Sequence, residues 1–234
     1  MLNSQKLVII LLGPPGSGKG TLATLLAEKF DLYYFETSKV IEANVMKAKS
    51  GDFLKVGSQK YNLLKEKNFW KTGMICSPLL VGFWIKQKIK KLAKEGEGIV
   101  LAGSPRTLPE GKEEIPLLKK LYGSKNIKVV LVEISAQESI WRNSHRRICQ
   151  LMRHPIIYAK ETAQLKRCPL DGSRLVRRKG LDEPETIKVR LKEYKEKTLP
   201  LIEYFKKQGL RTRKINGKGS VEVVFKRVLK SLRR

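Results

Sequence analysis

A glycine-rich segment near the start of the chain, residues 13–21 (Gly-Pro-Pro-Gly-Ser-Gly-Lys-Gly-Thr), constrains the fold more than any other feature. The apolar run of residues 6–12 precedes it and is typical of a short buried strand, bounded by a glycine and two prolines. Leucine and phenylalanine then recur at helical spacing through residues 19–30. The sequence therefore predicts a strand, a tight turn and a helix in direct succession.

The same segment has the composition of a phosphate-binding loop. Its glycines allow the backbone to curl so that N–H groups point inward at phosphate oxygens, and the following helix directs its positive end there. Lys19 adds a charge for the β- and γ-phosphates, and the Thr21 hydroxyl can ligate a magnesium ion. A glycine turn without a ligand is the alternative, which the flanking strand and helix disfavour. The expected phosphate-binding residues are Gly16, Ser17, Gly18, Lys19, Gly20 and Thr21.

The rest of the chain favours an α/β fold. Residues 99–102 and 129–134 are further short apolar runs next to helical segments, which indicates a parallel sheet covered by helices. Residues 36–76 are polar and helical with no convincing strand, and residues 145–182 are rich in Arg, Pro and Gly with two cysteines. We expect these two regions to be inserts in one core, formed by residues 1–35, 77–144 and 183–234.

Composition narrows the class of protein. The net charge of +27 suits polyanions, but the basic residues are spread from end to end, so we expect nucleic acid to bind at most by non-specific electrostatics. The longest apolar run is too short to cross a bilayer, and the start lacks an export signal. Three widely spaced cysteines do not suggest a disulfide framework. The sequence predicts a cytoplasmic protein without a membrane partner, acting as a monomer.

The glycine-rich loop, with Gly20 and Thr21 after its lysine, resembles that of adenylate kinases rather than that of GTPases. Further segments resemble the motifs of this family, in the family's order, along nearly the whole chain. They are residues 37–42 (Thr-Ser-Lys-Val-Ile-Glu), residues 103–107 (Gly-Ser-Pro-Arg-Thr), Arg142 with Arg146 and Arg147, residues 182–186 (Asp-Glu-Pro-Glu-Thr), Arg190 with Leu191 and Tyr194, and residues 215–221 (Ile-Asn-Gly-Lys-Gly-Ser-Val).

The resemblance implies a fold and an activity. It implies a P-loop three-layer core with a parallel five-stranded sheet, a monophosphate-binding insert at residues 36–76 and a lid at residues 145–182. The implied reaction is reversible transfer of the ATP γ-phosphate, with Mg²⁺, to a nucleoside monophosphate, AMP being favoured. Two alternatives stay open: the same chemistry on another monophosphate, or a weakly catalytic P-loop protein that binds nucleotide or nucleic acid.

The resemblance also assigns roles to residues. The catalytic residues would be Lys19, Arg106, Arg146 and Arg190, because arginine donates bidentately to phosphate oxygens. Besides the loop, ATP would contact Arg142, Arg146, Gly217 and Val221. The monophosphate would contact Thr37, Lys39, Cys76, Gly103, Arg106, Glu110, Arg178 and Arg190. Lys179 is an equally good candidate for the place of Arg178.

Three residues depart from the family pattern. Glu42 stands where the family has an arginine against the monophosphate, and we expect Lys39, one helical turn earlier, to pair with Glu42 or to contact the phosphate itself. Ala102 replaces an acidic residue that orders the magnesium hydration shell, which leaves Thr21 as the protein ligand. Glu110 replaces a glutamine that reads the adenine edge, and an ionised glutamate only accepts hydrogen bonds.

The lid contains a candidate zinc site. Cys149-x-x-Met152 and Cys168-x-x-Asp171 lie where some lids of the family have a zinc knuckle. Met152 takes the place of a thiolate and is a poor zinc ligand, although His154 can supply the fourth position. The sequence thus favours a metal-free lid, in which the two cysteines are packing residues, over a zinc site.

Overall fold

The computed structural model describes residues 6–72, 76–178, 180 and 182–233. Its centre is a five-stranded sheet in the order β10-β6-β1-β5-β2, and all four neighbouring pairs are parallel. The strands are β1 (Val8–Leu12), β2 (Tyr33–Phe35), β5 (Ile99–Leu101), β6 (Ile127–Glu133) and β10 (Thr212–Asn216). β1 lies in the middle, and all five of its residues are buried because helices cover both faces of a parallel sheet.

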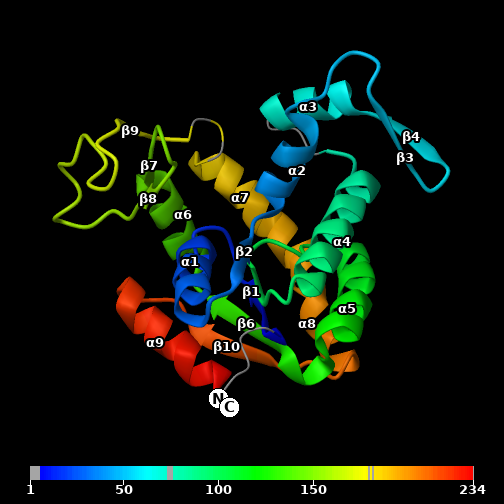
Figure 1. The fold of residues 1–234 in the computed structure, drawn as a ribbon. Helices are drawn as coiled ribbons and strands as arrows, with labels where there is room; N and C mark the ends of the chain where they lie inside the picture. The colour runs from blue at the N-terminus through cyan, green and yellow to red at the C-terminus, as the bar shows by residue number, and fades with distance from the viewer. Residues whose placement is uncertain (1–5, 73–75, 179, 181, 234) are drawn as a thin grey trace.

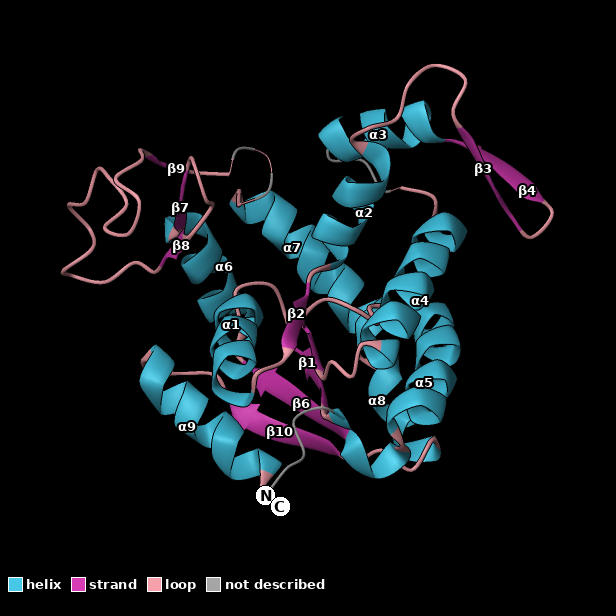
Figure 2. Ribbon diagram, in the orientation of Figure 1, coloured by secondary structure: helices cyan, strands magenta, loops and turns pink. Residues whose placement is uncertain are grey.

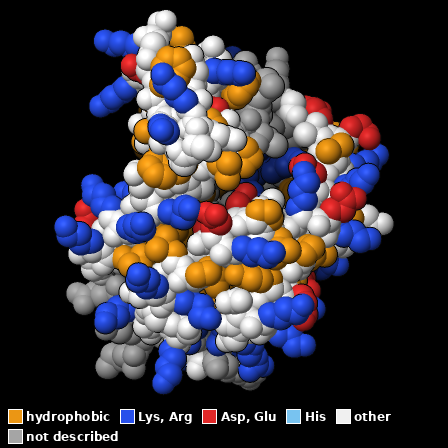
Figure 3. Space-filling view, turned by 90° about the vertical axis from the view of Figure 1, so that its right-hand side faces the viewer, with side chains coloured by type: hydrophobic (Ala, Val, Ile, Leu, Met, Phe, Trp, Pro, Cys, Tyr) orange, Lys and Arg blue, Asp and Glu red, His pale blue; other side chains and the backbone are white. Residues whose placement is uncertain are grey.

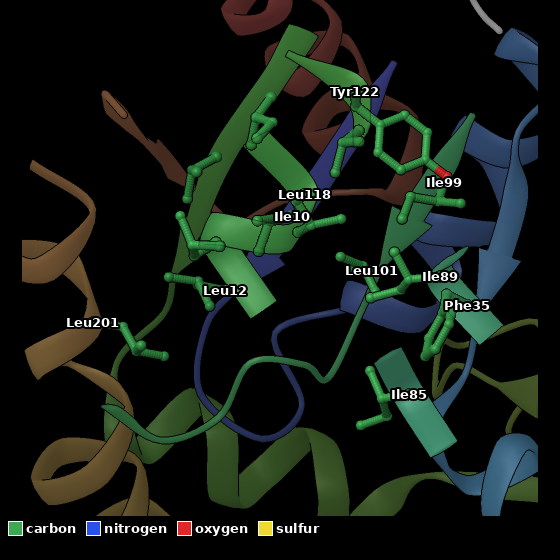
Figure 4. Packing of buried hydrophobic residues seen from close by; sticks show 14 of the residues in the cluster. Ile10, Leu12, Phe35, Ile85, Ile89, Ile99, Leu101, Leu118, Tyr122 and Leu201 are labelled. Atoms are coloured by element: carbon green, nitrogen blue, oxygen red, sulfur yellow. The ribbon is translucent and has the colours of Figure 1, made fainter. Parts of the chain in front are cut away.

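Helices form a layer on each face of the sheet (Figures 1 and 2). On one face lie α1 (Lys19–Phe30) and α9 (Val221–Leu232), whose buried Leu22, Leu26, Val224 and Val228 pack on the strands. On the other face lie α4 (Pro78–Lys94), α5 (Leu108–Tyr122) and α8 (Pro200–Lys207), around the larger apolar cluster that Figure 4 shows. The predicted three-layer α/β core is therefore confirmed.

Residues 36–76 form the first region outside the sheet. It comprises α2 (Thr37–Val45), the antiparallel pair β3 (Phe53–Val56) and β4 (Gln59–Asn62), and α3 (Leu63–Thr72). The prediction that this region has no strand is wrong. The hairpin forms because exposed and half-buried residues alternate along β3 and because Gly57 adopts a positive φ of 61° in the two-residue turn.

Residues 136–198 contain the second region and its flanking helices. α6 (Ala136–His145) leads into a small sheet of β7 (Arg147–Cys149), β8 (Pro155–Ile156) and β9 (Leu175–Val176). The chain returns through α7 (Pro184–Glu193) and a π-helical turn, η3 (Tyr194–Thr198), to α8. In Figure 1 this small sheet lies beyond α6, on the opposite side of the molecule from β3 and β4. No helix in the described ranges has the length and apolar character needed to cross a membrane.

The close packing of α5 on α8 gives a test of the core. A Cβ atom at Gly111 would lie 2.5 Å from Cδ2 of Leu201, a fully buried side chain. Such overpacking costs about 1–3 kcal/mol, more than the ~1 kcal/mol that alanine gains over glycine in a helix. We expect Gly111→Ala to lower the free energy of unfolding in urea denaturation.

Gly82 of α4 is the matched control, because a Cβ atom there meets nothing within 4 Å. We expect Gly82→Ala to raise the free energy of unfolding by about 0.5–1 kcal/mol. Equal stabilisation by both substitutions would show that α5 and α8 are not in close contact.

Candidate functional site

The loop between β1 and α1 has the conformation of an anion cradle. Gly16 and Gly18 adopt positive φ angles of 73° and 88°, which other residues adopt only with strain. The loop is pressed against α6, since a Cβ atom at Gly16 would lie 2.4 Å from Nδ2 of Asn143 and Ser139 Oγ donates to Pro15 O at 2.7 Å. The backbone of the loop is therefore fixed before any ligand arrives.

Lys19 begins α1 and folds back over this loop. Its Nζ donates to Gly13 O at 2.7 Å and to Pro14 O at 2.9 Å. Burial, together with the nearby positive charges of Arg106, Arg190 and Arg146, lowers the pKa of Lys19 to about 7. The three arginines lie close enough to affect this ammonium group, so the structure brings all four predicted catalytic residues together.

Arg178 belongs to the same group of cations. Burial lowers the pKa of Arg178 to about 10, with further contributions from Arg146 and Arg190 and an opposing one from Asp182. Burial and then Arg146 lower the pKa of Arg190 as well. The structure thus places Arg178 beside Arg146 and Arg190, two of the arginines predicted to be catalytic. Lys179, the alternative that the sequence left open, lies outside the described residues.

Asp182 is the anion that holds this group of cations together. Its side chain is 1% exposed, and Oδ1 accepts from Arg146 Nη2 at 2.5 Å while Oδ2 lies 3.5 Å from Arg178 Nε. No separate role for Asp182 was predicted from the sequence, although it is an acidic residue just after a run of basic ones. Asp182 therefore sets the positions of two arginines from the end of the lid.

The loop after β5 carries Arg106. Its Nε donates to Gly103 O at 2.5 Å, its backbone N–H donates to Glu110 Oε2 at 2.6 Å, and its carbonyl accepts from Thr198 Oγ1 at 2.8 Å. One carboxylate oxygen of Glu110 is therefore committed to the start of α5, which leaves the other for a ligand. The side chain of Arg106 is exposed, so its guanidinium has access to a bound anion.

Two of the residues predicted to contact the monophosphate, Thr37 and Cys76, differ in their hydrogen bonding. Thr37 Oγ1 is buried and has no hydrogen-bond partner within the described residues, which suits a group that awaits a ligand. Cys76 is buried, and burial raises the pKa of its thiol to about 11, so it is a neutral packing residue.

Lys39 lies apart from the arginines. Its Nζ forms an ion pair with Glu36 at 2.5 Å, rather than the pair with Glu42 that the sequence allows. It lines an outer groove between α2 and α4 with Trp84 and Lys88, and none of the catalytic arginines lines this groove. Glu36 is close enough because it directly precedes α2, where i,i+3 neighbours share a face.

Two of the residues predicted to border the ATP base, Arg142 and Gly217, are in contact. Arg142 Nη2 donates to Gly217 O at 3.0 Å, and its Nε donates to Glu138 Oε1 at 2.6 Å. A hollow of about 370 Å³ opens next to them, between the ends of β6 and β10. Val221 is the half-buried first residue of α9. Ligands bind at the carboxyl ends of the strands in open α/β sheets, where this hollow lies.

The lid gathers four groups that can bind a metal. One ligand atom each from Cys149, His154, Cys168 and Asp171 lies within 4.8 Å of the others. His154 Nδ1 is 3.5 Å from Cys149 Sγ and 3.6 Å from Cys168 Sγ, and Cys149 Sγ is 3.0 Å from Asp171 Oδ2. These separations are near the ~3.3–3.8 Å edges of a tetrahedron around zinc. The set therefore fits zinc, and Met152, 64% exposed, is not part of it.

Comparisons with known proteins agree with this geometry. The family model described as adenylate kinase matches residues 11–210. The chain belongs to the adenylate kinase family. A curated adenylate kinase of Methanothrix thermoacetophila is 34% identical over 96% of this chain and 97% of its own length. One of Streptomyces coelicolor is 31% identical over 97% and 98%. Membership in the family makes the chain a phosphotransferase of the nucleoside monophosphate kinase type.

The role of Asp182 gives a prediction about stability. Removal of its charge leaves Arg146 and Arg178 without their anion, and such a loss costs about 3–5 kcal/mol when the pair is fully buried. Both arginines are about a quarter exposed, so we expect Asp182→Ala to lower the free energy of unfolding by about 2 kcal/mol.

Glu185 is a suitable control for this substitution, because its side chain is 81% exposed and pairs only with Lys188 among the described residues. We expect Glu185→Ala to have no measurable effect in the same urea denaturation. If Asp182→Ala also leaves the free energy of unfolding unchanged, Asp182 does not hold the two arginines.

Proposed function

We propose that the protein transfers the γ-phosphate of Mg·ATP reversibly to AMP and yields two molecules of ADP. The observation that carries the proposal is the convergence of Lys19, Arg106, Arg146 and Arg190 next to the glycine loop. Five described cations lie in one place, counting Arg178, with Asp182 as the buried acid among them. Their charge suits a triphosphate that faces a monophosphate. A site of this kind favours phosphate ligands over neutral ones.

The proposed mechanism rests on positioning and charge. The loop N–H groups and Lys19 hold the β- and γ-phosphates, and Arg106 holds the acceptor phosphate in line with them. Arg146 and Arg190 neutralise the charge that develops on the transferring group. Mg²⁺ would neutralise the phosphates further, held by the Thr21 hydroxyl and by the phosphates, since magnesium commonly uses few protein ligands beside substrate oxygens. Closure of the lid would exclude water from the transfer.

Glu110 favours an acceptor monophosphate other than AMP. Glu110 keeps one carboxylate oxygen beyond its bond to the Arg106 amide, and an ionised carboxylate can only accept. Guanine offers adjacent donors at N1 and N2, whereas adenine offers one donor beside an acceptor. GMP is therefore the runner-up to AMP.

A coupled assay of diphosphate formation with ATP and each common monophosphate tests both proposals. We expect activity with AMP, and a preference for GMP would identify Glu110 as the residue that sets the choice. Lys19→Met should lower kcat by about 10²–10³-fold, as loss of one donor to the transferring group does. Lys29→Met, on the exposed side of the same helix, is the control and should keep the wild-type rate. A folded Lys19→Met protein with normal turnover would exclude the mechanism.

We further propose that the lid holds a structural zinc ion, with Cys149, His154, Cys168 and Asp171 as its ligands. The sequence favoured a metal-free lid, but the four ligand atoms lie close together, and the cluster around the two cysteines is small. Only Ile156 and the partly buried Leu175 accompany the two cysteines in that cluster. A zinc ion there would join the β7–β8 turn to the chain before β9 and replace the apolar core that this region lacks.

Elemental analysis of the purified protein tests the zinc proposal. We expect about one zinc per chain, its loss in Cys168→Ser, and a lower melting temperature after chelation because metal binding is coupled to folding. Met152→Ala is the matched control, since the exposed thioether is not a ligand, and it should keep the zinc. Absence of zinc from protein produced with added zinc would show that the cluster is a set of packing residues.

The distribution of charge bears on nucleic acid as a partner. Figure 3 shows Lys and Arg side chains spread over the face that it presents, with acidic side chains between them. A dispersed pattern of this kind supports weak, salt-sensitive binding of polyanions rather than a dedicated nucleic-acid site.

A further inference from the structure

Two polar side chains lie in the core behind the loop that carries Arg106. Ser104, in that loop, is 2% exposed, and Glu114 of α5 is 1% exposed. The Ser104 Oγ and Glu114 Oε1 atoms are 2.5 Å apart, whereas Glu114 Oε2 has no hydrogen-bond partner within the described residues. The next residue, Ile115, is fully buried. Burial of a carboxyl group at such a position lowers the stability of the fold unless the group is neutral, and an unpaired oxygen there calls for a functional explanation.

The pair is one of three attachments of this loop. Glu114 reaches it through Ser104, two residues before Arg106. Glu110 accepts from the Arg106 amide, and Thr198 of η3 donates to the Arg106 carbonyl. These contacts hold the loop on both sides of Arg106. They therefore set the point from which the Arg106 side chain extends. Glu114 is the only one of the three that contacts the loop from a fully buried position.

Burial keeps Glu114 protonated near neutral pH. It raises the pKa of Glu114 to about 8, opposed by the Ser104 hydrogen bond and then reinforced by the charge of Glu110. Arg106 lowers it and Glu113 raises it by smaller amounts.

The other helices against α5 present few ionisable groups. On α4, Lys86 pairs with Glu113 on the exposed side. On α8, the ring of Tyr204 packs against Gly111 and places no charge near the carboxyl group of Glu114. Among the groups that act on Glu114, Arg106 is therefore the positive one.

We propose that Glu114 is a positioning residue for Arg106, and that it makes binding of the acceptor phosphate depend on pH. As a neutral acid, Glu114 anchors Ser104 and does not attract the Arg106 guanidinium, which then binds the acceptor phosphate. As a buried anion, it attracts that guanidinium inward and competes with the phosphate. The proposal rests on the proposed role of Arg106 in acceptor binding.

Acceptor KM measured from pH 6.5 to 9 tests the proposal. We expect the wild-type acceptor KM to rise at least about threefold above pH 8 relative to that of Glu114→Gln, and the ATP KM, which follows the charge of Lys19, to change equally in the two proteins. Glu114→Gln keeps an acceptor for Ser104 and cannot ionise, so its acceptor KM should stay flat. Glu113→Gln removes an exposed charge one residue away and should keep the wild-type rise. A rise in the acceptor KM that persists in Glu114→Gln, or an ATP KM that differs between the two proteins by the same factor, overturns the proposal.

Two further measurements separate this proposal from the proposed function. If Arg106→Ala leaves the acceptor KM unchanged, the role of Arg106 is wrong and so is the proposal that rests on it. The melting temperature is independent of activity. A folded-state pKa above the unfolded one means that the folded state binds more protons between about pH 4.5 and pH 8, so stability falls as pH rises through this window.

We therefore expect the wild-type melting temperature to fall relative to that of Glu114→Gln between pH 5 and pH 8. A constant difference would show that Glu114 is not a neutral acid and would overturn the proposal. If Glu114→Gln does not fold, Ser104→Ala, which removes only the anchor, serves instead. Ser104→Ala should raise the acceptor KM at pH 7. A wild-type acceptor KM in that variant would show that the Ser104–Glu114 hydrogen bond does not position Arg106, and would overturn the proposal.

Discussion

Repulsion among five cations is the constraint on which the rest of the active site depends. Burial, and then the charges of Arg106, Arg190 and Arg146, lower the pKa of Lys19 to about 7. Burial and the charges of Arg146 and Arg190 likewise lower the pKa of Arg178. Two unit charges at ~4 Å repel by about 4 kcal/mol at an effective dielectric constant of 20. Such an arrangement persists only because the surrounding fold holds each side chain in place. Asp182 is the buried carboxylate that directly offsets the repulsion.

The fold brings these cations together from distant parts of the chain. Parallel strands put the loops after β1 and β5 at the same edge of the sheet, which places Lys19 next to Arg106. α6 and α7 supply Arg146 and Arg190 at the entry and exit of the lid. The π-helical turn η3 then returns to the core, where Thr198 bonds to the Arg106 carbonyl. π-helical turns are frequent at functional sites, because the extra residue redirects side chains.

Local patterns in the sequence predicted part of this arrangement. The bounds of α1 match the predicted residues 19–30, because apolar spacing and glycine turns are both local signals. The prediction missed β2, whose three residues are too short to show a pattern, and the β3–β4 hairpin. It also missed the pairing of Lys39 with Glu36, since either carboxylate lies within one turn of Lys39. Asp182, Ser104 and Glu114 act through contacts that the fold alone creates.

The acceptor side of the site depends on Arg106 more than the family pattern suggests. Glu42 presents a half-buried carboxylate in place of an arginine and has no ion-pair partner in the described part of the chain. Lys39, which was expected to offset it, is paired with Glu36 away from the arginines. On the proposed roles, the acceptor phosphate is then left with Arg106, whose loop is attached to Glu114 through Ser104. The transferring group would meet Arg146, which Asp182 holds. Asp182 contacts two guanidinium groups, whereas burial in an apolar core raises the pKa of Glu114 and keeps this acid neutral. On the role proposed above for Glu114, a rise in pH would therefore act on Arg106 through the loop that Ser104 anchors.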